Sequence, residues 1–330
     1  MRATTRTGAA VCRAVNEAAS QKIKTQSRWS LKNIVKDFKR HKVKYLMLTP
    51  VIVYFILFCY APMYGAIIAF KDYSPLKGIW GSNWVGLSHF FDFFTSTYFR
   101  RVVGNTFIIS LCDVIWGFPA PILLALLLNE IRGSAFKRIV QTASYMPHFI
   151  SLVVVCGIIK NFVVTDGLFN DIVAFFGGTR VSMLQKPEMF RTIFVSTNIW
   201  QQIGWDSIIY VAALTGIDRQ LYEAASIDGA SRFKQTFYVT LPSLVPTIVV
   251  LLILRLGQIL NVGFEKIILL YNESIYDTAD VISSFVYRRG LQELDWSFST
   301  AVGLFNSAVN CVFLIGANRA TKMVSGLSLW

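Results

Sequence analysis

Apolar residues gather in six long runs along this chain, separated by shorter polar segments. The runs cover roughly residues 45–70, 107–128, 149–164, 193–217, 244–264 and 299–317. At about 1.5 Å per residue, most of them are long enough to cross a hydrocarbon core of about 30 Å as α-helices. Pro50 and Pro62 predict bends in the first run, and Pro119 and Pro121 predict breaks in the second. The pattern predicts an all-α polytopic membrane protein with six transmembrane helices.

Composition supports the membrane class. The 330 residues are 54% hydrophobic and 15% charged, well below the charged fraction of about 25% in soluble domains. A net charge of +13 is high enough to raise the question of nucleic-acid binding. However, residues 1–44 hold 12 of the 32 lysines and arginines with only two acids, which leaves +3 for the remainder. The charge is therefore a topology signal, and no nucleic-acid partner is expected.

The distribution of basic residues predicts the orientation. If the N-terminus is cytoplasmic, the inner segments 1–44, 129–147, 218–243 and the end after 318 hold 20 lysines and arginines against six acids. The outer loops hold ten against 11. The positive-inside rule favours this arrangement, with both termini cytoplasmic in a bacterial inner membrane. The predicted organisation is a basic tail over 1–44, a six-span domain over 45–318 and a cytoplasmic tail over 319–330.

The N-terminal tail divides further. Residues 1–27 lack hydrophobic periodicity and are predicted to be disordered. From Trp29 onward, apolar residues recur at helical spacing among lysines and arginines, which predicts an amphipathic helix in contact with membrane lipid. A solvated basic leader is the alternative.

Catalytic and metal-binding patterns are missing from the sequence. The five cysteines form no Cys-x-x-Cys pair, and His41, His89 and His148 are scattered. There is no Gly-x-x-x-x-Gly-Lys-[Ser/Thr] phosphate loop. The chain is predicted to be no enzyme and to bind no cofactor or metal itself.

One polar segment, residues 218–243, separates the fourth and fifth apolar runs. Residues 220–227 are rich in helix formers, and Gly229 falls where a glycine cap would end that helix. A second amphipathic helix is predicted after the turn, ending near Pro242. Ala224 and Ala225 give the first helix a smooth surface that another protein can approach closely.

This segment resembles the Glu-Ala-Ala loop of the permease subunits of bacterial ATP-binding-cassette (ABC) importers. That signature is Glu-Ala-Ala, three residues, Gly, nine residues, Ile, any residue, Leu-Pro. Here Glu223-Ala224-Ala225, Gly229 and Leu241-Pro242 fall at its spacing, with Val in the Ile position. The alternative is an ordinary amphipathic loop between two spans.

Other stretches are similar to permeases that import oligosaccharides. They are Tyr45-Leu-Met-Leu-Thr-Pro50, Phe70-Lys-Asp-Tyr73, Trp84-Val-Gly-Leu87, Ala279-Asp-Val-Ile282 and Tyr287-Arg-Arg-Gly290. The group includes importers of complex or acidic saccharides such as alginate and uronate oligomers. The likeness covers residues 43–322 and implies the type I ABC importer permease fold. It also implies a second, paralogous permease, two ABC ATPases that use ATP and Mg, and an extracytoplasmic solute-binding protein.

The resemblance implies that the 218–243 loop is a coupling helix seated in a cleft of the ATPase. The coupling residues carried over are Glu223, Ala224, Ala225, Ser226, Asp228, Gly229, Leu241 and Pro242. Arg232 is added as a surface charge beside them, although simple solvation is its alternative role.

Polar residues within the apolar runs predict a path for the solute. Such groups are costly in lipid and therefore face a protein interior or a water-filled cavity. The predicted path residues are Asn198, Gln201, Gln202, Trp205, Asp206, Arg255, Gln258, Asn261, Asn306, Asn310 and Lys160. Asn198, Gln202 and Asp206 recur every four residues and share one helix face. Arg255 or Lys160 would suit an anionic sugar.

Several alternatives remain open at this stage. The polar residues are also suited to hydrogen bonds between helices, Asp206 and Arg255 to a structural ion pair, and Asp113 to a structural role. Lys160 also suits the outer membrane surface. An ABC permease for a non-sugar solute such as a peptide, an ion-coupled secondary transporter and a membrane scaffold are the alternative functions.

Overall fold

A computed structural model describes residues 40–326 together with 328 and 329, so the predicted features of residues 1–39 lie outside the described residues. The described chain is helical apart from one short antiparallel hairpin, in which β1 (Lys71–Asp72) pairs with β2 (Asn83–Trp84). It divides into two compact units, residues 1–65 and 66–330. The predicted all-α class is confirmed.

The described part of the first unit is one helical run. It consists of α3 (Lys42–Tyr54), a π-helical stretch over Phe55–Tyr60 and α4 (Ala61–Met63), and the helix continues through a 3-10 segment over Tyr64–Phe70. Pro50 lies inside α3 without ending it. Large apolar side chains are exposed along the run, including Met47 and Phe58. Such a surface suits contact with lipid rather than water.

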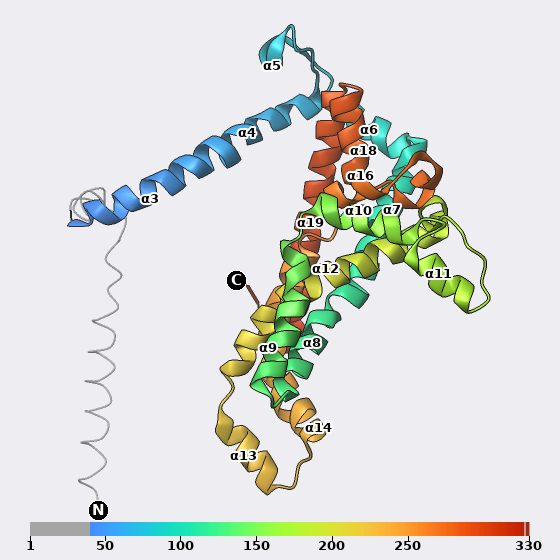
Figure 1. Cartoon of the computed structure of the whole chain (residues 1–330). Coiled ribbons are helices and arrows are strands. Elements are labelled where there is room, and N and C mark those ends of the chain that lie inside the picture. The colour runs from blue at the N-terminus through green and yellow to red at the C-terminus, as the bar shows by residue number, and fades with distance from the viewer. Residues whose placement is uncertain (1–39, 327, 330) are drawn as a thin grey trace, which may run out of the picture. The chain divides into compact units, whose positions relative to one another are not determined.

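The second unit carries the remaining elements (Figure 1). Its first half contains α5 (Gly78–Gly81), α6 (Ser88–Thr95), α7 (Thr97–Cys112), the π-helical turn η3 (Asp113–Gly117), α8 (Pro119–Glu130), α9 (Ser134–Tyr145), η4 (Met146–Phe149), α10 (Leu152–Val163), α11 (Leu168–Phe175) and η5 (Met183–Gln185). Its second half contains α12 (Pro187–Thr215), α13 (Arg219–Ile227), α14 (Arg232–Gln235), η6 (Thr236–Thr240), α15 (Leu241–Leu256), α16 (Phe264–Leu270), η7 (Glu273–Ile275), α17 (Tyr276–Ala279), α18 (Ile282–Tyr287), η8 (Arg288–Gln292) and α19 (Trp296–Ser325).

Five helical segments of the described chain are long and apolar enough to cross a membrane. They are Lys42–Phe70, Thr97–Glu130, Leu152–Phe175, Arg232–Leu256 and Trp296–Met323. The predicted fourth span corresponds to α12, whose 29 residues extend about 43 Å at 1.5 Å per residue. It is long enough to cross, but its amide and carboxylate side chains make it more polar than the other five.

The second span differs from its prediction, because its prolines do not break it. Ser96 caps the start of α7, where its Oγ accepts a 3.2 Å hydrogen bond from the Phe99 N–H. The helix then widens into η3, where the Phe118 N–H donates to the Asp113 carbonyl oxygen at 3.1 Å, and it continues as α8. Pro119 stands in the first turn of α8, where its missing N–H is tolerated because the wide π turn precedes it.

The long helix α12 runs through the middle of the second unit and packs against α8, α9 and α17. Its contact with α9 is a backbone contact. A Cβ added at Gly204 would lie 2.0 Å from the Ser144 carbonyl oxygen. Two apolar clusters of this unit include side chains of α12, and the larger of them joins Ile109, Ile159, Phe194 and Ile267 from α7, α10, α12 and α16. The middle of the unit is therefore fixed by packing on α12.

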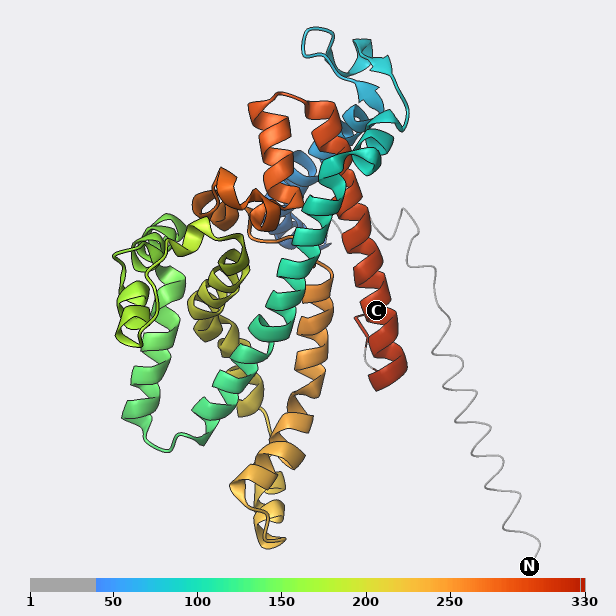
Figure 2. The ribbon, with the colours of Figure 1, turned by 90° about the vertical axis from the view of Figure 1, so that its right-hand side faces the viewer.

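Figures 1 and 2 place α13 and α14 at one end of the second unit and α6 and α18 at the opposite end. The segment 277–292 at the latter end is amphipathic in sequence, but it is not one continuous helix. It forms α17, a break at Asp280 and Val281, then α18 and η8. Asp280 leaves helical geometry because its fully buried carboxylate binds Arg101 and Arg288.

Candidate functional site

Two adjoining cavities of about 280 and 300 Å³ lie within the second unit. The residues that line both are Asp113, Asn198, Gln202, Asp206, Arg255 and Gln258. They come from η3, α12, the end of α15 and the turn that follows it, so these segments enclose one polar space. We call the two hollows together the central cavity.

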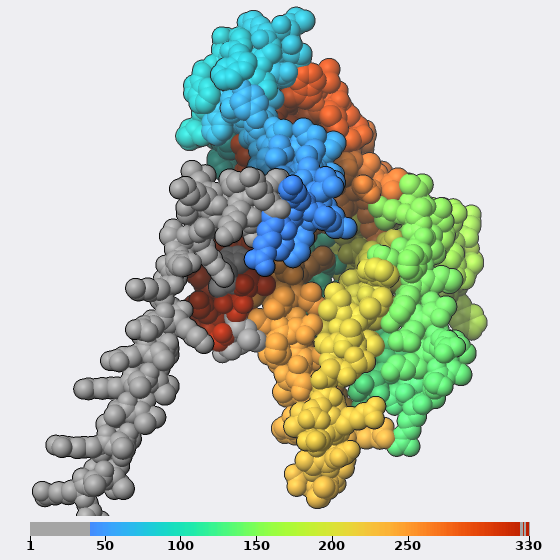
Figure 3. All heavy atoms as spheres, turned by 90° about the vertical axis from the view of Figure 1, so that its left-hand side faces the viewer, coloured from blue at the N-terminus to red at the C-terminus, as the bar shows by residue number. Residues whose placement is uncertain are grey.

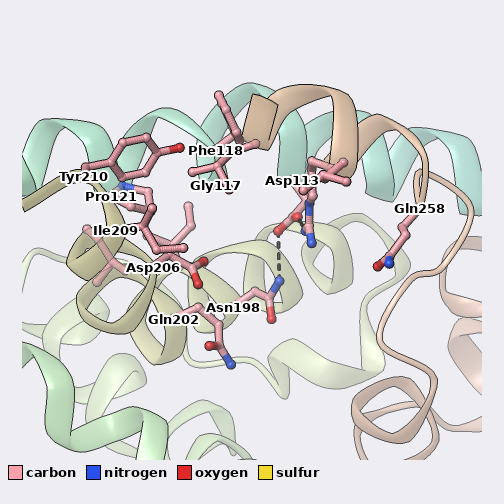
Figure 4. A pocket seen from close by; sticks show the side chains of 15 residues that line it. Asp113, Gly117, Phe118, Pro121, Asn198, Gln202, Asp206, Ile209, Tyr210 and Gln258 are labelled. Atoms are coloured by element: carbon pink, nitrogen blue, oxygen red, sulfur yellow. Dashed lines mark hydrogen bonds and ion pairs between the residues drawn. The ribbon is translucent and has the colours of Figure 1, made fainter. Parts of the chain in front are cut away.

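The α12 stripe lies along this cavity at the predicted four-residue spacing (Figure 4). The Asn198 amide donates a hydrogen bond of 2.9 Å to Asp113 Oδ1. Gln202 Oε1 lies 2.9 Å from Nδ1 of His148, which follows α9. Phe118 and Tyr210 add aromatic surface to the first hollow. The stripe therefore presents amide groups and rings to one space, as a sugar-binding surface requires.

Arg255 forms an ion pair with Asp113, not with Asp206. The Asp113 side chain is 9% exposed and that of Arg255 is 47% exposed. Asp113, interpreted from the sequence as structural, both lines the cavity and neutralises Arg255. Spacing on one helix could not reveal this pair, because its members lie on different elements.

Asp206 lines both hollows, and the hydrogen bonds and ion pairs of the described residues include none to its carboxylate. Figure 4 shows it on the same side of the cavity as Gln202 and Asn198. Because Arg255 is engaged by Asp113, Asp206 is the carboxylate whose charge is not balanced by a direct partner. Asp206 therefore adds a negative charge to the cavity, whereas attraction of an anionic sugar by charge would require a positive one.

Two other residues of α12 that were predicted to line the solute path, Gln201 and Trp205, do not line the central cavity. Gln201 is buried and its Oε1 lies 3.4 Å from Nζ of Lys266, outside the set that lines the cavity. The Trp205 ring stacks on His148 with centroids 4.3 Å apart and planes 1° apart. This stack joins α12 to the η4 turn and supports the wall behind Gln202.

The asparagines after α15 and on α19 form a cluster. The Asn261 Oδ1 accepts hydrogen bonds of 3.2 Å from the side-chain amides of Asn306 and Asn310. The Asn310 Oδ1 accepts from the Leu260 N–H at 3.0 Å. Asn261 itself lines the second hollow. The cluster thus ties the non-helical turn after α15 to α19 at the edge of the cavity.

Lys160 is not brought into the central cavity. It lies exposed near the end of α10 and lines a separate hollow of about 230 Å³ with Tyr271 and Asn272.

A different lysine, Lys266, lies close to the polar residues of α12 and was not predicted from the sequence. It is 3% exposed and its Nζ lies 3.4 Å from both Asn198 Oδ1 and Gln201 Oε1. Its signal was a single lysine inside the apolar stretch 264–270.

The loop with the Glu-Ala-Ala motif begins with a capped helix. The Asp218 side chain accepts from the Gln220 N–H at 3.0 Å and starts α13. Gly229 ends it with a φ of 74°, while the Ala230 N–H returns to the Ala225 carbonyl oxygen at 2.9 Å. This left-handed closure favours glycine because a Cβ would be strained there. The predicted glycine cap is therefore present.

The second helix of the loop is longer than predicted. It begins at Arg232 and passes Leu241 and Pro242 into α15 as far as Leu256, so Pro242 is no boundary. Proline is accepted at this position because the π-helical η6 precedes it. Arg232 pairs with Glu130 at the end of α8 at 3.4 Å. The loop is thereby tied to two spans.

The loop presents an apolar surface to its surroundings. Figure 3 shows it as a yellow-to-orange lobe projecting from the end of the second unit. Ile227 is 87% exposed, and Tyr238 and Phe233 are 80% and 74% exposed. Glu223 and Ala224 are exposed on the same loop, and the Ser226 Oγ accepts a 3.0 Å bond from Gln235 across the turn. An exposed apolar patch on a rigid loop is typical of a docking surface.

Comparisons with known proteins agree with this architecture. Residues 117–265 match the family described as "Binding-protein-dependent transport system inner membrane component". The chain is 44% identical over 285 residues to Protein LplB of Bacillus subtilis, covering 86% of this chain and 90% of that protein. It is 45% identical over 284 residues to the polygalacturonan/rhamnogalacturonan transport system permease protein YteP of the same species, covering 86% and 88%.

A solved structure is similar over nearly its whole length. A chain of a bacterial ABC transporter involved in the import of the acidic polysaccharide alginate superposes with a TM-score of 0.82 at 44% identity. The match covers 89% of this chain and 99% of that one. The chain therefore belongs to the family of binding-protein-dependent transport system inner membrane components. It is a multi-pass, non-catalytic permease subunit of an ABC importer, which sets aside the ion-coupled and scaffold alternatives.

Proposed function

We propose that this permease imports oligosaccharides, of the complex or acidic kind, by alternating access. The observation that carries the proposal is the central cavity, where Asn198, Gln202 and Gln258 lie near the rings of Phe118 and Tyr210. Amides bind hydroxyl groups and rings cover the apolar faces of sugars, so the lining suits a saccharide better than an apolar solute. Relatives named for polygalacturonan, rhamnogalacturonan and alginate transport support the same class.

The proposed topology has six spans, with α12 as the fourth, and both termini in the cytoplasm. The charge distribution supports this orientation. The polar side of α12 would then face the cavity while its other side packs on α8 and α9, which offsets the cost of polar groups at membrane depth. The domain limits 1–44, 45–318 and 319–330 follow from the same assignment.

The proposed assembly has a second permease, two ATPase subunits with ATP and Mg, and an external solute-binding protein. A related transporter was crystallised with a periplasmic protein carrying an alginate pentasaccharide, which supports the last partner. The docking residues are Glu223 to Gly229, of which all but the half-buried Ala225 are exposed, and the apolar side chains beside them. Movement of the ATPases would be transmitted by α13 to α15, because the Arg232 end of the loop is continuous with that span.

Preference for an acidic sugar rests on the relatives and not on a free cation in the cavity. Arg255 is paired with Asp113, and Lys160 lies elsewhere. A uronate in the cavity would therefore be held by amides and hydroxyl contacts in the vicinity of the unbalanced Asp206. The residues assigned to the path remain Asn198, Gln202, Asp206, Arg255, Gln258 and Asn261.

Uptake by the whole complex tests the proposal. Proteoliposomes with both permeases and both ATPases would receive labelled neutral or acidic oligosaccharides together with the cognate binding protein. ATP-dependent accumulation of either sugar is the expected result. Accumulation of a peptide or another non-sugar solute, without accumulation of any oligosaccharide, would overturn it.

A further inference from the structure

A further hollow of about 620 Å³ lies between α16, α18, η8 and the first half of α19. We call it the external groove. Figures 1 and 2 place α18 beside α19 at the end of the second unit opposite to α13. Three aromatic residues line it, namely Phe264, Tyr287 and Trp296. The central cavity and the function proposed above make no use of this groove.

The aromatic side chains of the groove are held in place. The Phe264 and Tyr287 rings lie with their centroids 5.3 Å apart. Trp296 packs against Tyr73 at 5.7 Å, and the Tyr73 N–H donates a 2.9 Å hydrogen bond to the Ser297 Oγ. The β1–β2 hairpin is therefore anchored beside the mouth of the groove. Fixed rings can stack on a ligand at little cost in conformational freedom.

The groove also contains side-chain oxygens without hydrogen-bond partners. Ser283, Ser299 and Asn306 line it, and within the described part of the chain Ser283 Oγ, Ser299 Oγ and Asn306 Oδ1 are buried without a partner. Ser299 as a whole is 6% exposed. Buried polar atoms are normally satisfied, so three exceptions around one hollow point to a ligand that supplies hydrogen bonds.

These features together favour a saccharide. A sugar ring offers an apolar C–H face to an aromatic ring and hydroxyl donors to oxygen acceptors. A lipid acyl chain would fill the apolar part but leave the three oxygens unpaired, which is costly. The mixture of rings with a few polar atoms is also the usual composition of a small-molecule pocket.

The groove is connected to the central cavity through Asn306. Its Nδ2 donates to the Asn261 Oδ1 at 3.2 Å, and Asn261 lines the second hollow of the central cavity beside Arg255 and Gln258. We infer that the external groove is a separate saccharide subsite, which receives a sugar unit before it passes the Asn306–Asn261 contact into the central cavity. This inference rests on the proposed function.

Gly303 allows the subsite to be blocked without disturbing the core. It lines the groove on α19, and a Cβ added there would have no atom within 4 Å. Gly303→Leu therefore places a side chain in the groove itself. Gly316→Leu is the matched control, because Gly316 lies on the same helix, also has open space at its Cβ and is not part of the groove.

The experiment compares uptake of a labelled oligosaccharide by proteoliposomes with the whole complex. For Gly303→Leu we expect uptake at low sugar concentration to fall about tenfold, while the second permease still co-purifies. Trp296→Leu, which keeps an apolar side chain but removes the aromatic ring, should raise the half-saturating sugar concentration severalfold. Gly316→Leu should behave as the wild type.

Two results would overturn the subsite. Uptake by Gly303→Leu and Trp296→Leu within twofold of the wild type would show that no sugar passes through the groove. Loss of the second permease from the Gly303→Leu complex would show that a partner helix fills it. Failure of the wild-type complex to import any oligosaccharide would instead refute the proposed function, and the subsite with it.

Discussion

Arg255 at the end of α15 and Asp113 in the π-helical turn η3 form an ion pair inside the central cavity. The pair joins the span that continues from the Glu-Ala-Ala loop to the span that carries the cavity wall. It also explains how an arginine and a carboxylate coexist at membrane depth, since each offsets the other's charge.

Removing one partner of this pair should destabilise the permease. For Arg255→Gln we expect a loss of about 1–3 kcal/mol, less than the 3–5 kcal/mol of a fully buried pair because Arg255 is 47% exposed. The double variant Asp113→Asn/Arg255→Gln should recover most of that loss, because it leaves no unpaired charge. Thermal unfolding of the detergent-solubilised complex provides the measurement. A double variant no more stable than the single one would argue against the pairing.

Removal of the unbalanced charge in the cavity should change selectivity. Asp206 lies in both hollows without a direct partner, so its charge repels a uronate carboxylate in the same space. For Asp206→Asn we expect uptake of acidic relative to neutral oligosaccharide to rise about fivefold, which corresponds to about 1 kcal/mol of screened repulsion. The measurement is competitive uptake of the two sugars.

Asp166→Asn serves as the control for this change of charge. Asp166 has a side chain that is 92% exposed and lies in the segment after α10, away from the cavity lining. It should leave the ratio of the two sugars unchanged. An equal effect of both substitutions would mean that net surface charge, not the cavity, sets the preference.

The glycine that closes α13 should be needed for coupling. Gly229 has a φ of 74°, which costs roughly 1 kcal/mol or more for a residue with a Cβ, and β-branched residues fit worst. Gly229→Val should therefore distort the loop and lower the ATPase activity stimulated by the loaded binding protein, with both permeases still assembled. Gly133→Ala, at a glycine with φ −77° before α9, should have little effect. Normal stimulation in Gly229→Val would show that the closure is dispensable.

Features that depend on neighbouring residues within one helix, such as the polar face of α12, could be predicted from the sequence. The four-residue spacing of Asn198, Gln202 and Asp206 is a local property of one helix, and it correctly predicted a shared face on the cavity. Likewise, Gly229 was predictable because a cap depends on neighbouring residues alone. The signals of local periodicity and capping therefore carried most of the fold.

Contacts between distant segments were not predictable in this way. Nothing in the neighbourhood of Arg255 indicates that Asp113 rather than Asp206 lies across from it. Lys266 is hidden for the same reason, because its partners are supplied by α12. Pro119 and Pro242 were misinterpreted because each follows a π turn that accommodates it, and the residues before these prolines carry no recognised signal for such a turn.

The buried carboxylate Asp280 should hold together the end of the second unit that lies opposite to α13. It is fully buried and binds Arg288 at 2.8 Å and Arg101 at 3.1 Å, while the Ser284 hydroxyl donates to it at 2.9 Å. Burial lowers the pKa of the Arg288 guanidinium, but its hydrogen bond and charge interaction with Asp280 leave that pKa raised overall. Asp280→Asn should thus leave Arg288 without a counter-charge and Arg101 with only the exposed Asp277 at 3.8 Å, and cost about 2–4 kcal/mol, since both arginines retain some solvent. For Asp280→Asn we expect faster hydrogen exchange over residues 276–292 in the assembled complex.

Asp277→Asn is the matched control, because Asp277 is 85% exposed and its Oδ1 lies 3.8 Å from Arg101. Equal exchange in the two variants would mean that the buried carboxylate does not fix the break between α17 and α18.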